Sequence, residues 1–404
     1  MLTSLALIFL IGLLTAGICR KIRLPRIIGM LVTGIILGPY VLDLLDSSIL
    51  SISAELRQIA LIIILLKAGL SLNLADLKKV GRPAVMMSCV PAGVEILAFF
   101  LFAPTILGIT RIEAAVMGSV LAAVSPAVVV PRMIQLMETG YGTEKSIPQL
   151  IMAGASCDDI FVIVLFSSFS EMASGGSARL MDFVNIPVSI ILGVVLGMIT
   201  GYLLSLFFEA SYAHGHLVRN SMKVMIVLGI SFLLMEAENR AKEVVAVSGL
   251  LAVISMACML KVKCAPSVSS RLSEKFGKLW IAAEVVLFVL VGAAVDIRYT
   301  LEAGIAALVM ILIALAFRSA GVAFCLLGTE LTPKERIFCM IAYLPKATVQ
   351  AAIGSVPLAM GLPCGKMVLS VAVLAILVTA PLGAIGMDMS YKRLLQYAQT
   401  QRKH

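Results

Sequence analysis

Uninterrupted apolar runs, each about as long as a bilayer is thick, recur along the 404-residue chain and constrain its fold more than any other feature. A transmembrane α-helix needs roughly 20 consecutive apolar residues, whereas a transmembrane barrel shows alternating apolar and polar positions. The chain is 60% hydrophobic and 14% charged, against about 45–50% and about 25% in a typical soluble domain. The sequence therefore predicts an all-α polytopic membrane protein without a large soluble domain.

About 13 segments qualify as transmembrane helices. They are predicted at about residues 2–19, 26–45, 57–73, 84–108, 114–133, 148–169, 185–208, 222–237, 243–262, 279–296, 303–328, 336–360 and 366–388. The first segment has no basic residue before it, and its positive cluster follows it. We therefore expect a retained span with its N-terminus outside, and not a cleaved signal peptide.

Lysine and arginine are distributed unevenly between the two sets of turns. One set, together with the C-terminal tail, carries 22 of the 32 basic residues, the opposite set carries 7, and three lie inside spans. Because cytoplasmic loops carry the excess of basic residues, the C-terminus is predicted in the cytoplasm. The net charge of +9 then reflects topology and predicts no nucleic-acid partner. Short loops suggest a bacterial inner (plasma) membrane.

The eight cysteines form no CxxC pair, and most of them lie in apolar runs. A thiol in such a run behaves as a small hydrophobic group. The spacing therefore predicts neither a disulfide framework nor a cysteine metal site. We expect no cofactor.

Two adjacent carboxylates, Asp158 and Asp159, lie inside the segment predicted at 148–169. An ionised side chain inside the bilayer is costly and normally faces a partner or a water-filled cavity. Each carboxylate also disfavours ionisation of the other. We therefore predict that protons and a cation, Na⁺ or Li⁺, occupy this pair alternately, because such hard cations prefer oxygen ligands.

Other ionisable residues inside spans need partners or a route to water. Arg318 stays charged, so a carboxylate partner is required, and the sequence leaves open whether this is Glu95 or Asp158. Glu95 is predicted as a structural or a site carboxylate. Lys67 is interpreted as a lysine that reaches the interface, and Glu284 as a structural or interfacial carboxylate. Two loop histidines, His214 and His216, are ordinary loop residues or a pH sensor.

The segment at 114–133 contains Ser125, Pro126 and Pro131. Each proline removes a helical hydrogen bond and opens the preceding turn. Unwound backbone inside a membrane is tolerated only where it is buried in protein or lines a cavity. We therefore predict either a simple kink or a broken helix, with the Ser125 hydroxyl at the break as a cation ligand.

The segment at 336–360 repeats this pattern, because Pro345 and Lys346 precede Thr348 and Gln350. Thr348 offers a second hydroxyl ligand. Lys346 is predicted either to neutralise the negative helix ends at the break of its own segment or to belong to a structural ion-pair network. The segments at 84–108, 114–133 and 148–169 match the last three segments at an offset of seven spans, and an odd offset inverts the topology. Paired interrupted helices in two such halves indicate a transporter site near the membrane midplane.

These residues resemble the cation/proton antiporter superfamily, and most closely its NHA branch of sodium/proton exchangers, related to NhaA and NapA. The motifs that carry the resemblance are Val124-Ser-Pro-Ala-Val-Val-Val-Pro131, Ala155-Ser-Cys-Asp-Asp-Ile160, the deep Arg318, and Leu344-Pro-Lys-Ala-Thr-Val-Gln-Ala-Ala-Ile-Gly354. The resemblance extends over essentially the whole chain.

The resemblance implies a homodimer with an NhaA-like fold. Its transport core is expected at about 84–169 and 303–388, with two crossing broken helices, and its dimerisation helices at about 1–73 and 185–296. Asp159 matches the ion-binding carboxylate, and Asp158 the carboxylate that pairs with the basic residue at Arg318. An arginine at this position cannot release a proton, which argues against an electrogenic two-proton exchange.

The predicted function is therefore antiport of Na⁺ (or Li⁺) against H⁺ by alternating access, and not an enzymatic reaction. Membrane lipids, monovalent cations and protons are the expected partners. K⁺/H⁺ antiport and proton- or sodium-coupled transport of an organic ion are the alternatives on the same fold. An intramembrane aspartyl protease needs two aspartates on facing helices, whereas adjacent residues of one helix point about 100° apart. Inverted broken helices argue against a passive cation channel.

Overall fold

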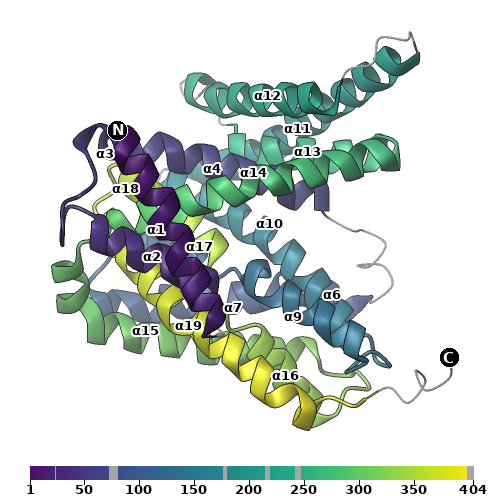
Figure 1. Cartoon of the computed structure of the whole chain (residues 1–404). Helices are drawn as coiled ribbons and strands as arrows, with labels where there is room; N and C mark the ends of the chain where they lie inside the picture. Colours follow the sequence, from purple (N-terminus) through teal and green to yellow (C-terminus); the bar gives the residue numbers. More distant parts are fainter. Residues whose placement is uncertain (23, 72–80, 176–179, 214–218, 242–246, 398–404) are drawn as a thin grey trace. The chain divides into compact units, whose positions relative to one another are not determined.

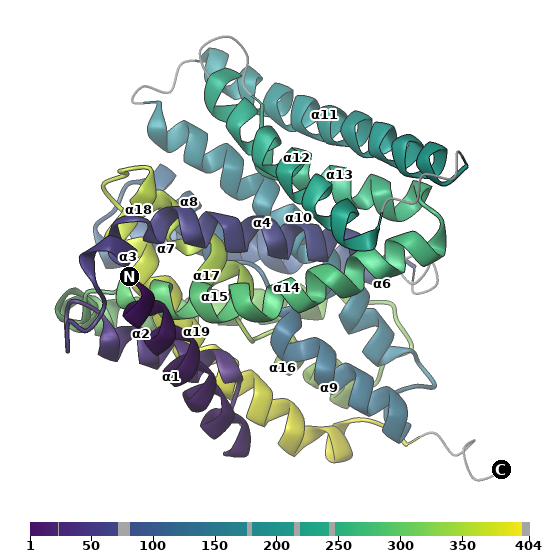
Figure 2. The same cartoon turned by 45° about the horizontal axis from the view of Figure 1, so that its top comes forward.

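The computed structural model describes residues 1–22, 24–71, 81–175, 180–213, 219–241 and 247–397. The described residues are mostly helical and contain no strand beyond one isolated bridge between Tyr141 and Tyr397. Figures 1 and 2 label the helices. They are α1 (Leu2–Lys21), α2 (Arg26–Leu37), α3 (Ser47–Ser51), α4 (Ser53–Ser71), α6 (Arg82–Met87), α7 (Val90–Leu107), α8 (Arg111–Leu121), α9 (Pro126–Thr139), α10 (Ile147–Ser174), α11 (Leu180–Ala213), α12 (Asn220–Ala241), α13 (Gly249–Lys263), α14 (Pro266–Ala293), α15 (Ile297–Cys325), α16 (Pro333–Ala342), α17 (Thr348–Gly354), α18 (Val356–Ala359) and α19 (Gly365–Leu394). The predicted loop histidines, His214 and His216, lie outside the described residues.

Nine helical segments of the described chain are long and apolar enough to cross a membrane. The prediction of a helical multi-pass membrane protein is therefore confirmed, whereas the count of 13 spans stays a prediction. The remaining predicted spans coincide with helices that are shorter, interrupted or more charged. The clearest difference is at 26–45, where α2 ends at Leu37 because Gly38 precedes a proline and takes an extended conformation.

The chain forms two compact units. The first comprises Met1–Ala54, Asn73–Val162 and Leu287–His404. Within it α1 packs along α2, α7 packs against α8 and α15, and α19 packs against α16 and α17. The second unit comprises Glu55–Leu72 and Ile163–Val286, and in it α11 and α12 pack against α13. The division into a transport core and dimerisation helices stays a prediction.

Two segments of the first unit are interrupted helices. α8 ends at Leu121 and α9 begins at Pro126, so residues 122–125 are not helical. Proline is tolerated at the first position of a helix, where its missing N–H costs no hydrogen bond. Pro131 lies inside α9, which continues to Thr139. The predicted break therefore occurs at Pro126 and not at Pro131, where one lost hydrogen bond leaves the helix intact.

The second interruption separates α16, which ends at Ala342, from α17, which begins at Thr348. The two helices that lead into the breaks, α8 and α16, begin with the same capping box. Thr110 and Glu113 form it in α8, and Thr332 and Glu335 form it in α16. In a capping box, the threonine side chain accepts a hydrogen bond from the backbone N–H of the glutamate, and the glutamate side chain accepts one from the backbone N–H of the threonine.

The second break is packed tightly against α19. A Cβ atom at Gly383 would lie 2.3 Å from Cγ and 2.6 Å from Cδ of Pro345. One turn earlier in α19, the Thr379 hydroxyl accepts a 3.0 Å hydrogen bond from the backbone N–H of Lys346. Since a proline ring cannot swing aside, any larger residue at position 383 must displace the break.

We expect Gly383→Ala to lower the thermal unfolding midpoint of the purified protein, because overpacking a well-filled interior costs about 1–3 kcal/mol. Gly93→Ala in α7 is the matched control, since no atom lies within 4 Å of a Cβ built there. Equal midpoints for the two variants would show that the break is not held by this contact.

Candidate functional site

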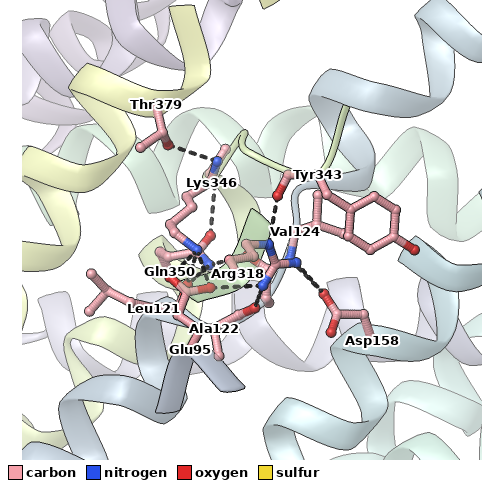
Figure 3. Close-up of polar contacts among 12 residues, drawn as sticks. Glu95, Leu121, Ala122, Val124, Asp158, Arg318, Tyr343, Lys346, Gln350 and Thr379 are labelled. Atoms are coloured by element: carbon pink, nitrogen blue, oxygen red, sulfur yellow. Dashed lines mark hydrogen bonds and ion pairs between the residues drawn. The ribbon is translucent and has the colours of Figure 1, made fainter. Parts of the chain in front are cut away.

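The guanidinium of Arg318 lies at the centre of a buried polar cluster in the first unit (Figure 3). Arg318 belongs to α15 and is 0% exposed. Its Nη1 donates to Glu95 Oε2 at 2.8 Å, and its Nη2 donates to Asp158 Oδ2 at 3.0 Å. These carboxylates come from α7 and α10. The arginine therefore pairs with both of the partners that the sequence left open.

Arg318 also donates to the backbone at both helix breaks. Its Nε donates to the carbonyl of Tyr343 at 2.6 Å, and its Nη1 donates to the carbonyl of Ala122. These carbonyls directly follow the last residues of α16 and α8. The final carbonyls of a helix lack intrahelical partners and carry the negative end of its dipole. One guanidinium therefore donates hydrogen bonds to two carboxylates and two helix ends.

Lys346 makes the second set of charge contacts. Its Nζ lies 2.7 Å from Glu95 Oε1, and it donates to the carbonyl of Leu121. Leu121 is the last residue of α8, so the ammonium neutralises the end of the other broken helix. The prediction that Lys346 acts at the break of its own segment is wrong, because its long side chain reaches across to α8. Its part in an ion-pair network is observed.

The two breaks are joined directly to each other. The Ser125 N–H donates to the carbonyl of Pro345 at 2.8 Å. Gln350 accepts from the Ala347 N–H at 2.8 Å and donates through Nε2 to the carbonyl of Ala123 at 2.7 Å. Backbone groups left free by both interruptions thus find partners inside the cluster, as buried polar groups require.

Asp158 is fixed by its contacts. Besides Arg318, its Oδ2 accepts from the Val124 N–H at 2.7 Å, at the first break. Asp159, the next residue of α10, is 7% exposed. Among the described residues it forms no ion pair, and its buried Oδ1 has no hydrogen-bond partner. Successive side chains of a helix point about 100° apart, so two adjacent carboxylates have different surroundings.

Ser125 Oγ and Asp158 Oδ1 are among the other buried oxygens that have no hydrogen-bond partner within the described part of the chain. Buried polar atoms are almost always bonded, so unbonded ones indicate a site for water or an ion. Thr348 is buried at the first position of α17. The described residues contain no group of three or more His, Cys, Asp or Glu side chains able to hold a resident metal ion.

The other ionisable residues singled out in the sequence lie elsewhere. Lys67 and Glu284 belong to the second unit. The Lys67 ammonium lies 5.8 Å from the ring centroid of Trp280, and Glu284 and Lys67 attract each other electrostatically. Their assignment as interfacial or structural residues stays a prediction.

Sequence reasoning missed several members of the cluster. The Tyr343 ring faces the Arg318 guanidinium, 5.5 Å from its centroid, and Thr379 holds the backbone of Lys346. A polar threonine inside an apolar span was the only available signal for Thr379. The carbonyls of Leu121, Ala122 and Ala123 had no signal, because backbone acceptors become visible only where a helix is known to end.

Comparison with known proteins finds sodium/hydrogen exchangers both among family models and among similar sequences. A family model described as "Sodium/hydrogen exchanger, transmembrane" matches residues 5–388. Sodium/hydrogen exchanger 9B2 of Homo sapiens is 34% identical over 399 residues, which cover 94% of this chain and 71% of that protein. Sodium/hydrogen exchanger 9B1 of Homo sapiens is 32% identical over 420 residues, covering 98% and 78%.

The fold is also similar to a solved structure. The sodium proton antiporter MjNhaP1 from Methanocaldococcus jannaschii matches with a TM-score of 0.83 and 21% sequence identity. The match covers 97% of this chain and 98% of that one. At this identity the likeness concerns the fold alone.

We expect Arg318→Gln to unfold the protein at a clearly lower temperature, because it leaves Glu95 and Asp158 buried without their shared cation. Removing one partner of a buried ion pair costs about 3–5 kcal/mol. Arg240→Gln is the control, since Arg240 is 81% exposed in an ion pair with Glu236 and such pairs contribute little. Similar thermal unfolding midpoints for both variants would contradict the central role of Arg318.

Proposed function

Because the chain belongs to the transmembrane sodium/hydrogen exchanger family, we propose that it exchanges Na⁺ for H⁺ by alternating access, with Asp159 binding the two ions in turn. The resemblance predicted from the sequence is confirmed at the level of the family. The observation that carries the assignment of Asp159 is the contrast between two adjacent carboxylates. Asp158 is held by Arg318 and by a backbone N–H, whereas Asp159 is buried without an ion-pair partner among the described residues.

A buried carboxylate without a fixed cation cannot remain ionised and empty at low cost. It must take up a proton or a metal cation, and both bind to the same oxygens. Competition for Asp159 is then the coupling step, because a proton displaces the cation and a cation displaces the proton. Asp158 takes up no proton in this exchange, since two donors hold its Oδ2, and only its Oδ1 is available to the cation.

The cation ligands that we propose are oxygens of Asp159 and Asp158, with the Ser125 and Thr348 hydroxyls and water completing the shell. Carboxylate, hydroxyl and water oxygens suit hard cations such as Na⁺ and Li⁺. The unbonded Oγ of Ser125 and Oδ1 of Asp158 support this assignment, because both are buried and available.

The broken helices support a transporter mechanism. Two interrupted helices with matching capping boxes place their inner ends against each other in one unit. Interrupted helices in two inverted repeats form the substrate sites of several transporter folds. We propose that this region, at about 84–169 and 303–388, moves as the transport core against dimerisation helices at about 1–73 and 185–296 in a homodimer. The proposed orientation is N-terminus outside and C-terminus in the cytoplasm, and the type of membrane stays a prediction.

Charge balance in the cluster favours one proton per cation. Glu95, Asp158 and Asp159 supply three negative charges when all are ionised, while Arg318 and Lys346 supply two positive charges. A single proton on Asp159, or a single bound Na⁺, therefore makes the cluster neutral. Since arginine does not release its proton in proteins, Arg318 acts as a permanent counter-charge and adds no second proton to the exchange.

We expect Asp159→Asn to abolish cation-dependent proton flux in proteoliposomes while the protein stays folded, because an amide binds neither a proton nor Na⁺ as a carboxylate does. Asp43→Asn provides a matched exchange of carboxylate for amide. Asp43 is exposed, and its φ of 50° is one that asparagine adopts readily. Transport by the folded Asp159→Asn protein at the rate of Asp43→Asn would refute the assignment.

The stoichiometry makes a separate prediction. Proton flux driven by Na⁺ or Li⁺ should run at the same rate at two imposed membrane potentials, because exchange of one proton for one cation moves no net charge. The measurement compares Na⁺, Li⁺ and K⁺ in the same vesicles, which also tests cation selectivity. Flux that follows the voltage would reveal a second titrating group, with Asp158 and Glu95 as the residues to replace next.

A further inference from the structure

A cavity of about 590 Å³ lies inside the second unit, where α11 and α13 end and α12 and α14 begin. Its lining includes three basic side chains, Arg219, Lys223 and Arg271, against a single carboxylate, Glu209. The turns that contribute them belong to the set rich in lysine and arginine, which is predicted to face the cytoplasm.

Lys223 is the most informative residue of this cavity. It is only 7% exposed, and its ammonium has no ion pair or hydrogen bond among the described residues. Its Nζ lies 5.3 Å from the centroid of the Phe208 ring. A buried ammonium normally has an anionic partner, because removing its hydration is costly. The ammonium lines the cavity instead, where an anionic ligand can reach it.

The backbone adds donors to the same cavity. Asn220 is the first residue of α12, and Ser267 is the second residue of α14; both line it. The first N–H groups of a helix have no intrahelical acceptor and carry the positive end of its dipole. Anions, and phosphate groups above all, bind at such helix starts.

The charge of the lining is positive. The Cys264 thiol also lines the cavity, and burial raises its pKa to about 11, so it stays neutral near pH 7. Three cations therefore face one carboxylate, which leaves an excess of two positive charges. This excess matches a phosphate group with two negative charges better than a monovalent anion.

We propose that this cavity is an anion site that binds a phosphate group between the starts of α12 and α14, with Lys223 as its buried counter-charge and Arg219 and Arg271 at its exposed rim. Arginine suits the rim, because its planar fork of donors pairs with two phosphate oxygens at once. The site lies at the end of membrane-spanning helices. The phosphate therefore belongs either to the headgroup of an anionic lipid or to a small soluble molecule, since both present the same chemistry.

The test measures the thermal unfolding midpoint of the full chain in phosphatidylcholine nanodiscs, followed through its single tryptophan, Trp280 of α14. One arm titrates inorganic phosphate against chloride at equal ionic strength, and the other replaces part of the phosphatidylcholine with phosphatidic acid. We expect stabilisation in at least one arm. A response to phosphate alone identifies a soluble ligand, and a response only to phosphatidic acid identifies a lipid headgroup.

Variants connect the response to the cavity. Lys223→Gln and Arg271→Gln should each raise the half-saturating concentration of the active probe about tenfold, which corresponds to one lost charge-assisted contact. Lys223→Arg should largely restore it. Arg271 is exposed, so its variant folds even if Lys223→Gln does not.

The matched control is Lys278→Gln, which removes the same charge from α14 at an exposed position paired with Glu274 and outside the cavity. It should leave the response unchanged. The proposal would be overturned if neither arm stabilised the protein. It would also be overturned if Lys278→Gln and Arg271→Gln had equal effects, because the response would then come from general attraction of anions by a basic surface.

Discussion

The ion pairs of Arg318 are the interaction on which the first unit depends. Burying a guanidinium removes its hydration at a cost of several kcal/mol, and the surroundings offset this cost only if its N–H donors are satisfied. Here the donors reach Glu95, Asp158 and the carbonyls at the ends of α8 and α16. Four segments far apart in the sequence therefore meet at one side chain, and none of them can be removed without leaving a buried charge or a free carbonyl.

This arrangement distinguishes two paired carboxylates from one that has no ion-pair partner in the described chain. Glu95 lies between Arg318 and Lys346 and is paired with both, and Asp158 is held by Arg318 and the Val124 N–H. A lysine at position 318 would supply one ammonium that is able to lose its proton, whereas arginine stays charged. The permanent charge adds no titrating group at position 318, and Asp159 is the member of the cluster for which no cationic partner is present in the described chain.

Three buried cations, Arg318 and Lys346 in the first unit and Lys223 in the second, have different surroundings. In the first, Arg318 and Lys346 are matched by carboxylates and carbonyls from the chain itself, so the cluster is internally balanced apart from one acid. In the second, Lys223 is buried beside Phe208 and faces a positively lined cavity. A complete set of internal partners is typical of a structural network, whereas a buried cation in a cavity with excess positive charge is the basis of the proposed anion site.

The sequence by itself determined the membrane class, because only helices about 20 residues long satisfy the backbone inside a bilayer. It also singled out Asp158, Asp159, Glu95, Arg318 and Lys346, since an ionisable side chain in an apolar run is conspicuous wherever it folds. Pro126 and Pro345 likewise marked the two interruptions, because proline limits the backbone locally. The sequence did not show which partners these side chains contact. Only the tertiary structure decided that Arg318 contacts both Glu95 and Asp158 and that Lys346 reaches α8. It also decided that Lys223 faces a cavity shared by two helix starts. Each of these contacts joins residues far apart in the chain or on separate helices, and no local pattern encodes which distant helix end or carboxylate lies within the reach of a side chain.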